Sequence, residues 1–326
     1  MTDSSRRIDV SVVVVSYNTR DWLGRCLASI PAAARDNGVE VIAVDNASKD
    51  GAADAVADAF PEAHVIRNAE NVGFGRAVNQ GATFARGEYL MLLNPDGYLE
   101  PHAIDRLVSF AKSNPQYVIC GGRTVSPTGE LDPRSCWAAP SLWSLACGAT
   151  LLSTLRPGSP LFDPEAMGDF RRDHVRQVDI VTGCLLLASL EDWRSLGGFD
   201  ERYFVYGEDA DLCLRATAQT GRACAITPEA VMVHAVGASS ASRPDKLELL
   251  LKGRIALARA HLKGWKSGLG ASLIIWGVWL RAMLERTGAS QRTSWREVWR
   301  RRERWREGYR PQGTLRQAPT ADRSVA

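Results

Sequence analysis

The sequence lacks the cysteine spacings that mark zinc sites and redox motifs. Its seven cysteines are odd in number and scattered along the chain, with no C-x-x-C pair among them. This pattern argues against a disulfide framework and is typical of reduced thiols in a cytoplasmic protein. A small secreted domain held together by disulfides is therefore excluded.

The chain also lacks a hydrophobic run long enough to cross a bilayer, which requires about 20 apolar residues. The segment from Leu269 to Leu280 is strongly apolar but shorter than this. The first residues, MTDSSRRIDV, are polar and contain no apolar region of a signal peptide. We therefore expect a cytoplasmic protein without a membrane-spanning helix.

Positive and negative charges nearly balance over the whole chain, but positive charge is concentrated in one part of it. The formal net charge is +3, whereas the segment from Arg281 to Arg310 contains ten Arg and four Glu. Six of the ten tryptophans lie in or near this segment, at positions 265, 276, 279, 295, 299 and 305. Interleaved Trp and Arg suit an amphipathic helix on a membrane with anionic headgroups. Nucleic-acid binding and a simple packing helix are the alternative interpretations.

Apolar strands and amphipathic helices alternate four times in the first hundred residues. The expected strands are Val10 to Val15, Val39 to Val44, His64 to Arg67 and Tyr89 to Leu93. This alternation predicts an α/β fold, with a Rossmann-like, mostly parallel twisted sheet covered by helices on both faces.

Polar residues follow the ends of three of these strands. In an open parallel sheet the carboxyl ends of the strands lie at one edge, and ligands bind there. We expect these residues to converge on one site: Ser16, Tyr17, Asn18, Asp45, Asn46, Asn94 and Asp96.

In the second half of the chain, the sequence patterns that predict helices and strands are weaker. Residues 123–176 are rich in Pro, Trp and Ser and lack a clear periodicity, which predicts an irregular excursion over the active face. An acid cluster follows, Glu208-Asp209-Ala210-Asp211, and then a strand that ends at His234. A helix is expected from about Arg243 to His261.

Seven segments of the chain, in consistent order and spacing, resemble the motifs of family 2 glycosyltransferases of the GT-A fold. They are VSVVVVSYNTRDWLGRCLASI, VIAVDNASKDGA, NVGFGRAVNQG, YLMLLNPD, VTGCLLLA, GGFDERYFVYGEDADLCLRA and VMVHAVGAS. The likeness covers about Val10 to Ser240. It is greatest to the bacterial rhamnosyltransferase-like branch that builds cell-surface polysaccharide.

The resemblance implies an inverting, metal-dependent hexosyltransferase of cell wall and polysaccharide biosynthesis. Such an enzyme would move a sugar, for example L-rhamnose, from a dTDP- or UDP-sugar to a saccharide acceptor linked to polyprenyl diphosphate. We expect it to be cytoplasmic and peripheral to the inner membrane, with no nucleic acid as partner. The alternatives are another donor, a UDP-hexose or a GDP-sugar, and a catalytically silent subunit that binds sugar nucleotides.

The same resemblance suggests a division of the chain. Residues 1–240 would form the GT-A domain, with a nucleotide-binding half at about 1–122 and an acceptor-binding half at 123–240. Residues 241–312 would form a helical, Trp- and Arg-rich extension that associates with the membrane. Residues 313–326 are expected to be a disordered tail.

A sugar nucleotide carries a diphosphate leaving group, whose departure requires a divalent cation or a cluster of cations. Mg²⁺ or Mn²⁺ takes few protein ligands, so one or two carboxylates at a strand end suffice. We assign Asp96 to this role. The family often has Asp-x-Asp here, whereas this chain has Asn94-Pro95-Asp96, so the ion must recruit another ligand, and His234 is the candidate. The alternatives are a solvated turn for Asp96 and a structural role for His234.

For the nucleotide, the resemblance assigns Asp45 to the N3–H of uracil or thymine, and an ordinary helix cap is the alternative. Ser16, Tyr17 and Asn18 would line the base or ribose pocket, with Asn94 at the adjacent strand end. The segment Gly73-Phe74-Gly75-Arg76 is not a dinucleotide fingerprint, because its third glycine is missing and it follows the third strand. Instead, this helix N-terminus would approach the diphosphate, with Arg76 and Asn79 as contacts. A solvated helix Arg is the alternative for Arg76.

Inverting sugar transfer needs a general base that deprotonates the acceptor hydroxyl. By resemblance, Asp209 is this base, and Glu208 and Asp211 support it. Acids at a helix N-terminus, favoured by the helix dipole, are the alternative. Thr182 and Gly183 are expected to face the acceptor, whereas Cys184 is interpreted as a packing residue because no activating base accompanies it.

Overall fold

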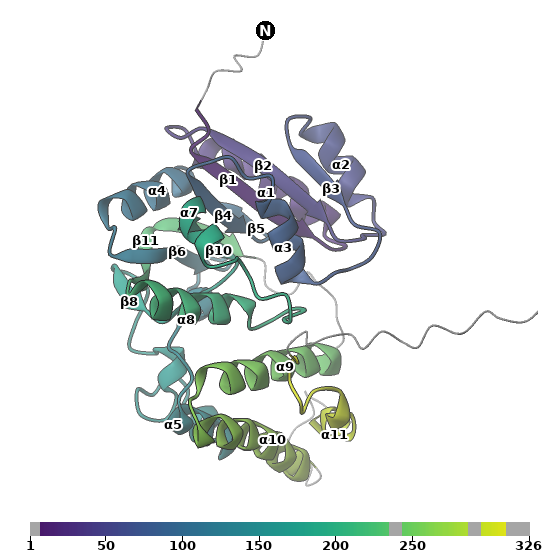
Figure 1. Cartoon of the computed structure of the whole chain (residues 1–326), viewed down its shortest axis with the longest axis vertical. Helices are drawn as coiled ribbons and strands as arrows, with labels where there is room; N and C mark the ends of the chain where they lie inside the picture. Colours follow the sequence, from purple (N-terminus) through teal and green to yellow (C-terminus); the bar gives the residue numbers. More distant parts are fainter. Residues whose placement is uncertain (1–6, 235–242, 286–294, 311–326) are drawn as a thin grey trace, which may run out of the picture.

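The computed structural model describes residues 7–234, 243–285 and 295–310, so the tail predicted at 313–326 lies outside the described residues. Its centre is a nine-stranded sheet, and a layer of helices lies at one end of it (Figure 1). The strand order along the main path is β3-β2-β1-β4-β10-β6-β11-β5, with β8 paired to β11.

The first half of the sheet is parallel, as the alternating pattern predicts. Its strands are β1 (Val10–Ser16), β2 (Val39–Asp45), β3 (His64–Arg67) and β4 (Tyr89–Leu93). The helices that connect them are α1 (Arg20–Ala33), α2 (Ala52–Ala59) and α3 (Phe74–Ala82). All seven residues of β1 are buried, because helices cover both faces of the sheet.

The second half of the sheet is mixed. The strand β10 (Leu185–Ser189) is antiparallel to both β4 and β6 (Tyr117–Val125). The strand β11 (Ala223–His234) is parallel to β6 and antiparallel to β5 (Gly97–Leu99) and β8 (Arg176–Val178). A small separate ladder joins β7 (Cys136–Trp137) to β9 (Ile180–Val181). A mixed, mostly parallel sheet is the result.

Alternate residues of β1 serve two hydrophobic cores. Val12 and Val14 pack with α1, α2 and α4 (Ala103–Ser113) on one face of the sheet. Val13 and Val15 pack on the other face with α3, α7 (Leu190–Ser195) and α8 (Glu208–Thr220). The two-residue period of the strand therefore produces the three-layer architecture.

The segment 123–176 is irregular over most of its length, as its composition predicts, and its Asp132 lies beside His234, but it also forms several short helices. It contains η1 (Pro133–Ser135), α5 (Leu142–Ala149), α6 (Leu152–Leu155) and η2 (Pro164–Ala166). The Ser141 side chain caps α5 in a reciprocal pair with Ser144. These helices are too short to show a periodicity, and α5 packs on the C-terminal helices.

The helical layer consists of α5 together with three later helices and a short turn. These are α9 (Arg243–His261), α10 (Trp265–Glu285), α11 (Trp295–Arg300) and η3 (Arg302–Arg304). They share a third hydrophobic core that includes Leu145, Ile255, Ile274 and Trp305. Because Leu145 comes from α5, this layer is built from two parts of the chain that lie far apart in sequence.

The apolar segment near residue 270 is longer than the sequence analysis expected. Among the described residues, α10 is the one helix long and apolar enough, by length and composition alone, to cross a membrane. A single helix of this kind is weak support for a membrane span. Here α10 packs against α5, α9 and α11 along one side.

The Trp- and Arg-rich tail is also less exposed than its composition suggests. Trp305 is fully buried and its indole N–H donates to the Val298 carbonyl, 2.9 Å away. Trp295 and Trp299 pack against the same core. Arg301 forms ion pairs with Asp245 and Glu248 of α9 at 2.8 and 3.3 Å. Much of this segment is therefore used for internal packing and pairing.

Candidate active site

The strands β1, β2 and β4 end at the same edge of the sheet. Ser16 lies beside Asp45 in the parallel register of β1 and β2. Beyond them, the Asn18 side chain accepts a hydrogen bond from the Lys49 N–H at 2.8 Å, and the Asn18 N–H donates to the Ser48 hydroxyl at 3.0 Å. These bonds join the two loops, and Asn18 adopts a left-handed φ of 54° there. The loops after β1 and β2 therefore lie together, and the use of all seven predicted polar residues in one site stays a prediction.

Asp45 is a buried carboxylate with unused hydrogen-bonding capacity. Its Oδ2 accepts one hydrogen bond, from the Ser48 N–H at 3.3 Å, while its Oδ1 has no partner among the described residues. Asp45 is only 8% exposed to solvent. A buried acceptor without a partner is costly, so a ligand N–H at this point would be stabilised. Tyr17, next to this pair of strands, is exposed.

Asp96 and His234 meet where β5 pairs with β11. His234 lies opposite Gly97 in this antiparallel ladder, and its Nε2 is 3.0 Å from the Asp96 Oδ1. The other imidazole nitrogen, Nδ1, is 3.6 Å from the Asp132 Oδ2. Burial alone would lower the pKa of His234, but Asp132 and Asp96 outweigh it and raise this pKa to about 9.

Asp132 is itself held by Arg134. The Arg134 guanidinium donates to both Asp132 oxygens at 2.8 and 3.0 Å, and its backbone N–H donates at 3.1 Å. Burial opposes ionisation, but the hydrogen bonds from His234 and Arg134 hold the pKa of Asp132 well below its usual range. The imidazole of His234 thus lies between two carboxylates.

These side chains fit a divalent cation. Ligand atoms at neighbouring corners of an octahedral Mg²⁺ or Mn²⁺ site, each about 2.1 Å from the ion, lie about 3 Å apart. The 3.0 Å separation of the Asp96 Oδ1 and the His234 Nε2 is that of a hydrogen bond and also matches this spacing, so a cation would take the place of the proton between them. Carboxylate is an ordinary ligand for such ions, whereas imidazole suits transition-metal ions better than Mg²⁺.

A different group of potential ligands, Asp36, His102 and Asp105, lies away from this edge. Asp105 accepts hydrogen bonds from the backbone N–H groups of Arg35 and Asp36 and from the Asn37 amide. These bonds fix the turn before β2, at the opposite edge of the sheet. The carboxylate therefore already has a structural function.

The turn at Thr182-Gly183-Cys184 connects the two acidic parts of the site. The Asn94 amide donates to the Cys184 Sγ at 3.0 Å, and the Gly183 N–H donates to the Asp209 Oδ2 at 3.0 Å. Burial, together with the nearby charges of Asp96 and Asp209, raises the pKa of Cys184 to about 12. A thiol with this pKa is neutral near pH 7, so it is a poor nucleophile.

Asp209 and Glu208 begin helix α8 after Gly207. The Asp209 Oδ1 accepts from the Ala210 N–H at 2.8 Å, so each of its oxygens accepts one backbone N–H. Burial raises the pKa of Asp209, against the effect of these hydrogen bonds. Burial, and next the charge of Asp209, raise the pKa of Glu208 well above its ordinary value. Burial therefore raises the pKa of both carboxyl groups, and Asp209 accepts more of the backbone hydrogen bonds that favour its ionised form.

Asp211 has a structural role. It is 1% exposed, accepts from Arg215 at 2.7 Å and lies 2.8 Å from the His261 Nε2 at the end of α9. Arg215 also donates to the carbonyls of Leu196 and Gly198. These bonds fix α8 to its neighbours, and the support of Asp211 for Asp209 in catalysis stays a prediction.

The N-terminus of α3 meets the chain before α8. The Phe74 N–H donates to the Phe204 carbonyl at 2.7 Å. The Asn79 side-chain nitrogen donates to the Phe199 carbonyl, and the Asn79 side-chain oxygen accepts from the Phe199 N–H. The exposed Arg76 pairs with Glu201 at 3.6 Å. These bonds occupy Asn79 within the protein, and the nucleotide contacts assigned to Asn79 and Arg76 stay predictions.

Sequence reasoning missed three residues near this edge: Asp132, Arg134 and Tyr206. Asp132 and Arg134 lie in the segment without periodicity, and only the Asp-Pro-Arg turn signal marks them. Tyr206 has a left-handed φ of 68°, which is unusual for a bulky residue. Burial, followed by the charges of Glu208 and Asp96, raises its pKa, which places the phenol near both acids.

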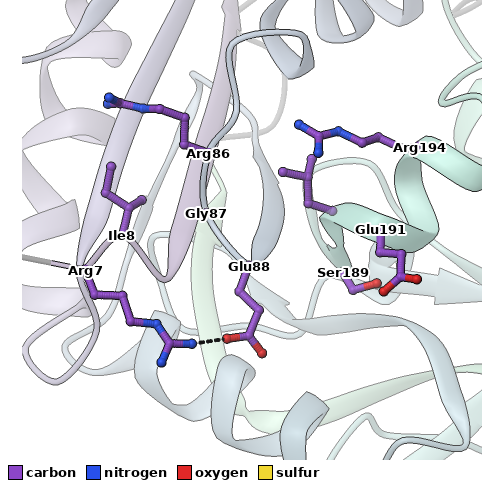
Figure 2. Close-up of a pocket in the computed structure, with 9 residues that line it drawn as sticks. Arg7, Ile8, Arg86, Gly87, Glu88, Ser189, Glu191 and Arg194 are labelled. Atoms are coloured by element: carbon purple, nitrogen blue, oxygen red, sulfur yellow. Dashed lines mark hydrogen bonds and ion pairs between the residues drawn. The ribbon is translucent and has the colours of Figure 1, made fainter.

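A surface pocket lies at the opposite edge of the sheet, around the starts of β1 and β4 (Figure 2). Several of its charged groups are already engaged: Arg7 pairs with Glu88 at 2.6 Å, and Arg194 donates to the Ala85 carbonyl at 3.2 Å. This pocket is remote from the strand ends that carry the acids. We therefore do not associate it with catalysis.

A mixed, mostly parallel sheet with acids gathered at its carboxyl edge and a helical C-terminal region is the architecture of a GT-A glycosyltransferase. Comparison of the sequence with known families agrees with this class. The chain belongs to glycosyl transferase family 2, whose model matches residues 11–178. The fold and the family expected from the sequence are thus confirmed.

The chain is similar to an N-acetylglucosaminyl-diphospho-decaprenol L-rhamnosyltransferase of Mycobacterium tuberculosis. The two are 29% identical over 279 residues, which cover 79% of this chain and 87% of the relative. It is also 27% identical over 239 residues to the O-antigen biosynthesis protein RfbC of Myxococcus xanthus, covering 71% of this chain and 17% of that protein.

Two solved structures share the fold. The mannosyltransferase PcManGT from Pyrobaculum calidifontis, in complex with GDP-Man and Mn²⁺, superposes with a TM-score of 0.56 at 19% identity, covering 88% of this chain and 77% of that one. TarS 1-349 of S. aureus, in complex with UDP, gives 0.51 at 14% identity, covering 86% and 73%.

Proposed function

We propose that this glycosyltransferase moves L-rhamnose from a dTDP- or UDP-sugar to a lipid-linked saccharide acceptor, with inversion at the anomeric carbon. The proposed reaction mechanism rests on the position of Asp209. Backbone N–H groups fix both of its oxygens, and the Thr182–Cys184 turn connects it to the strand end that carries Asp96.

Asp209 would act as the general base. Its carboxylate takes the proton of the acceptor hydroxyl while the hydroxyl oxygen attacks the anomeric carbon of the donor. The bond between that carbon and the diphosphate oxygen breaks on the opposite face, and the nucleoside diphosphate leaves. One displacement of this kind inverts the configuration. Thr182 and Gly183, beside Asp209, would face the acceptor.

Asp96 and His234 would hold a divalent cation, Mg²⁺ or Mn²⁺, and Asp132 would hold the His234 imidazole in position. When bound, the ion supplies positive charge to the departing diphosphate. The Mn²⁺ in the structure of PcManGT supports this choice, since the two proteins share a fold.

Asp45 would recognise the base of the donor. Its unpartnered Oδ1 can accept the N3–H of uracil or thymine, a group that a guanine does not present in the same place. Ser16, Tyr17 and Asn18 would line the same pocket, and Asn94 and Arg76 would lie near the diphosphate. This assignment favours a dTDP- or UDP-sugar over a GDP-sugar.

The identity of the acceptor and of the donor sugar rests on the mycobacterial relative. The name of that protein specifies L-rhamnose transfer to N-acetylglucosaminyl-diphospho-decaprenol. An acceptor of this type is anchored in a membrane, which is why we place the enzyme on the cytoplasmic side of the inner membrane.

The test uses the purified full chain with Mn²⁺, a panel of dTDP-, UDP- and GDP-sugars and a polyprenyl-diphosphate N-acetylglucosamine acceptor. Asp209→Asn should lower the transfer rate by about 10²–10⁴-fold, the usual contribution of a general base, while nucleotide affinity changes less than twofold. Glu130→Asn, an exchange of an exposed acid, is the matched control and should leave the rate unchanged.

Full transfer by the Asp209→Asn variant would overturn the assignment of the base. If the wild-type chain binds nucleotide sugars but transfers none of them, the silent-subunit alternative is correct. Preferential use of a GDP-sugar would contradict the role of Asp45.

A further inference from the structure

Helix α10 presents an apolar stripe that the described part of the chain leaves uncovered. Trp265, Leu269, Trp276 and Trp279 are 71%, 42%, 43% and 38% exposed. Their spacing of four, seven and three residues places them on one side of the helix. The opposite side, through residues such as Ile274 and Val278, packs into the core of the helical layer.

The neighbouring α5–α6 segment also carries exposed apolar side chains. Trp143, Leu155 and Leu161 are 50%, 71% and 58% exposed. The two segments are in close contact, since a Cβ on Gly277 of α10 would lie 2.8 Å from the Cα of Ala149 at the end of α5. Arg281 strengthens the junction by donating to the Gly148 carbonyl at 2.9 Å.

We call the exposed stripe of α10 the tryptophan face, and it consists of Trp265, Leu269, Trp276 and Trp279. Large exposed apolar side chains elsewhere among the described residues are more scattered, such as Phe84 and Val175. A clustered apolar surface of this kind marks an interaction site in a soluble protein.

The charges around the tryptophan face are mostly positive. The segment from Ser141 to Leu161 contains Arg156 and no acidic residue. The segment from Lys263 to Glu285 contains two Lys, one Arg and one Glu. Lys263, Lys266 and Arg156 are exposed. A partner with negative charge next to an apolar layer is therefore complementary to this surface.

We propose that the tryptophan face lies flat on a bilayer whose headgroups are anionic. Tryptophan is favoured at the boundary between headgroups and acyl chains, because its ring is apolar and its N–H is polar. Lysine and arginine beside such rings interact with anionic lipid. Within the predicted extension 241–312, the structure thus assigns membrane contact to α10, and less to residues 295–310, whose tryptophans pack into the helical layer.

Two other occupants fit the observations less well. A second copy of the chain, seated on the same face around a two-fold axis, would bring the same cations together. A membrane-spanning α10 would have to lose the contacts of its inner side with α5, α9 and α11.

This proposal deepens the proposed function and rests on its lipid-linked acceptor, which is found at the same bilayer surface. The active-site helix is joined to the helical layer, because Asp211 of α8 bonds His261 at the end of α9. In Figure 1, α8, α9 and α10 follow one another away from the sheet. Contact of α10 with the bilayer would therefore fix the position of the active site relative to it.

The experiment is flotation of the full chain with vesicles, without donor or acceptor. One set of vesicles is pure phosphatidylcholine and the other contains about 30% phosphatidylglycerol. We expect binding to the anionic vesicles that weakens at high salt. Trp276→Ser combined with Trp279→Ser should lower the partition coefficient at least tenfold. Phe84→Ser, which removes an exposed aromatic ring outside the tryptophan face, is the matched control and should bind like the wild type.

Each result has a defined meaning. Loss of binding only in the Trp276/Trp279 variant supports the proposal, provided that its thermal unfolding is unchanged. Equal binding of that variant and the wild type overturns it, as does a dimer that dissociates in the variant without any vesicle binding. Resistance of the bound wild type to carbonate extraction would overturn the flat orientation. Transfer to a water-soluble acceptor tests the proposed function separately, because it does not require vesicles.

Discussion

Glu208 is a buried carboxyl group whose Oε2 has no hydrogen-bond partner among the described residues. Its raised pKa, caused by burial and then by the charge of Asp209, keeps the proton on the folded protein at a pH where the unfolded chain releases it. The unfolded state then binds fewer protons, so the free energy of unfolding falls as pH rises from about 4.5 toward the folded-state pKa.

Glu208→Gln should remove this fall in the free energy of unfolding with rising pH. The free energy of unfolding of the variant, relative to the wild type, should increase between pH 4.5 and pH 8, by about 1.4 kcal/mol for each unit by which folding raises the pKa. Urea unfolding at the two pH values measures it. Glu130→Gln, in an exposed loop, is the control and should follow the wild type. Parallel curves for Glu208→Gln and the wild type would show that Glu208 is not protonated in the folded state.

Asp132 contacts His234 on the side away from Asp96. Carboxylates that hold a metal-binding imidazole in place typically contribute a factor of about 10–100 to metal affinity. Asp132→Asn should therefore weaken Mn²⁺ binding by this factor, measured by titration with electron paramagnetic resonance in the absence of substrates. Asp173→Asn is the matched control, since Asp173 also pairs with a histidine, His174, but on the protein surface. An unchanged Mn²⁺ affinity in Asp132→Asn would exclude the positioning role.

At the scale of single elements, the close approach of β5 to β11 depends on Gly97. A Cβ at this position would lie 2.8 Å from the Val233 carbonyl oxygen and would also overlap Met232. Because a backbone atom cannot move aside without a large energetic cost, Gly97→Ala should push the strands apart and move Asp96 away from His234. This explains why a glycine follows the acid in the Asn-Pro-Asp-Gly turn.

We expect Gly97→Ala to lower the free energy of unfolding by about 1–3 kcal/mol, the usual effect of overpacking, and to weaken Mn²⁺ binding. Gly24→Ala in α1 is the comparison, because no described atom lies within 4 Å of a Cβ there. That change should stabilise the protein by about 0.5–1 kcal/mol. Denaturant titration of both variants tests the pair, and equal effects would contradict the steric argument.

The elements that sequence predicts well are those whose signals are local. The β-branched run of β1 and the polar residues after it need no distant partner to be recognised, and neither does the helix at Arg243–His261. The proximity of Asp96 and His234 is different, since it depends on the antiparallel pairing of β5 with β11. That pair was anticipated only because a metal would need a second ligand.

Other features depend on contacts between distant segments and leave little trace in the sequence. Asp132 lies beside His234 because the chain turns back after β6, where an isolated antiparallel β-bridge joins Val125 to Leu131. The packing of α5 on α10 relies on small residues, Gly277 and Ala149, whose importance appears only at close approach. Composition alone also could not separate the inward Trp305 from the outward Trp276.

At the scale of the whole molecule, the sheet and the helical layer are joined by buried polar contacts as well as by apolar packing. Asp211 is bonded to Arg215 within α8 and to His261 of α9. Burial opposes its ionisation, but these two partners lower its pKa. A charge held in this way is stabilising only while both partners are present.

This arrangement bears on the division at residue 240 that the sequence suggested. A fragment ending at residue 242 would lose α9 and α10, and with them His261 and the cover of Leu145 on α5. The Arg215 ion pair to Asp211 stays within the fragment, whereas the loss of the His261 hydrogen bond to this buried charge costs about 1.5–3 kcal/mol. At about 2–4 °C per kcal/mol for a domain of this size, the Tm of the fragment should be lower than that of the full chain by roughly 3–12 °C.

The cause of this loss can be separated from a general effect of truncation with one substitution. In the full chain, Leu145 is 3% exposed, so Leu145→Ser should destabilise it by about 2–4 kcal/mol. In the fragment the same side chain would face water, so Leu145→Ser should be neutral for stability and should reduce aggregation. Thermal unfolding and light scattering of the four proteins measure the effect. A fragment that melts cooperatively at the Tm of the full chain would show instead that residues 1–242 fold on their own, and that the helical layer is an appendage.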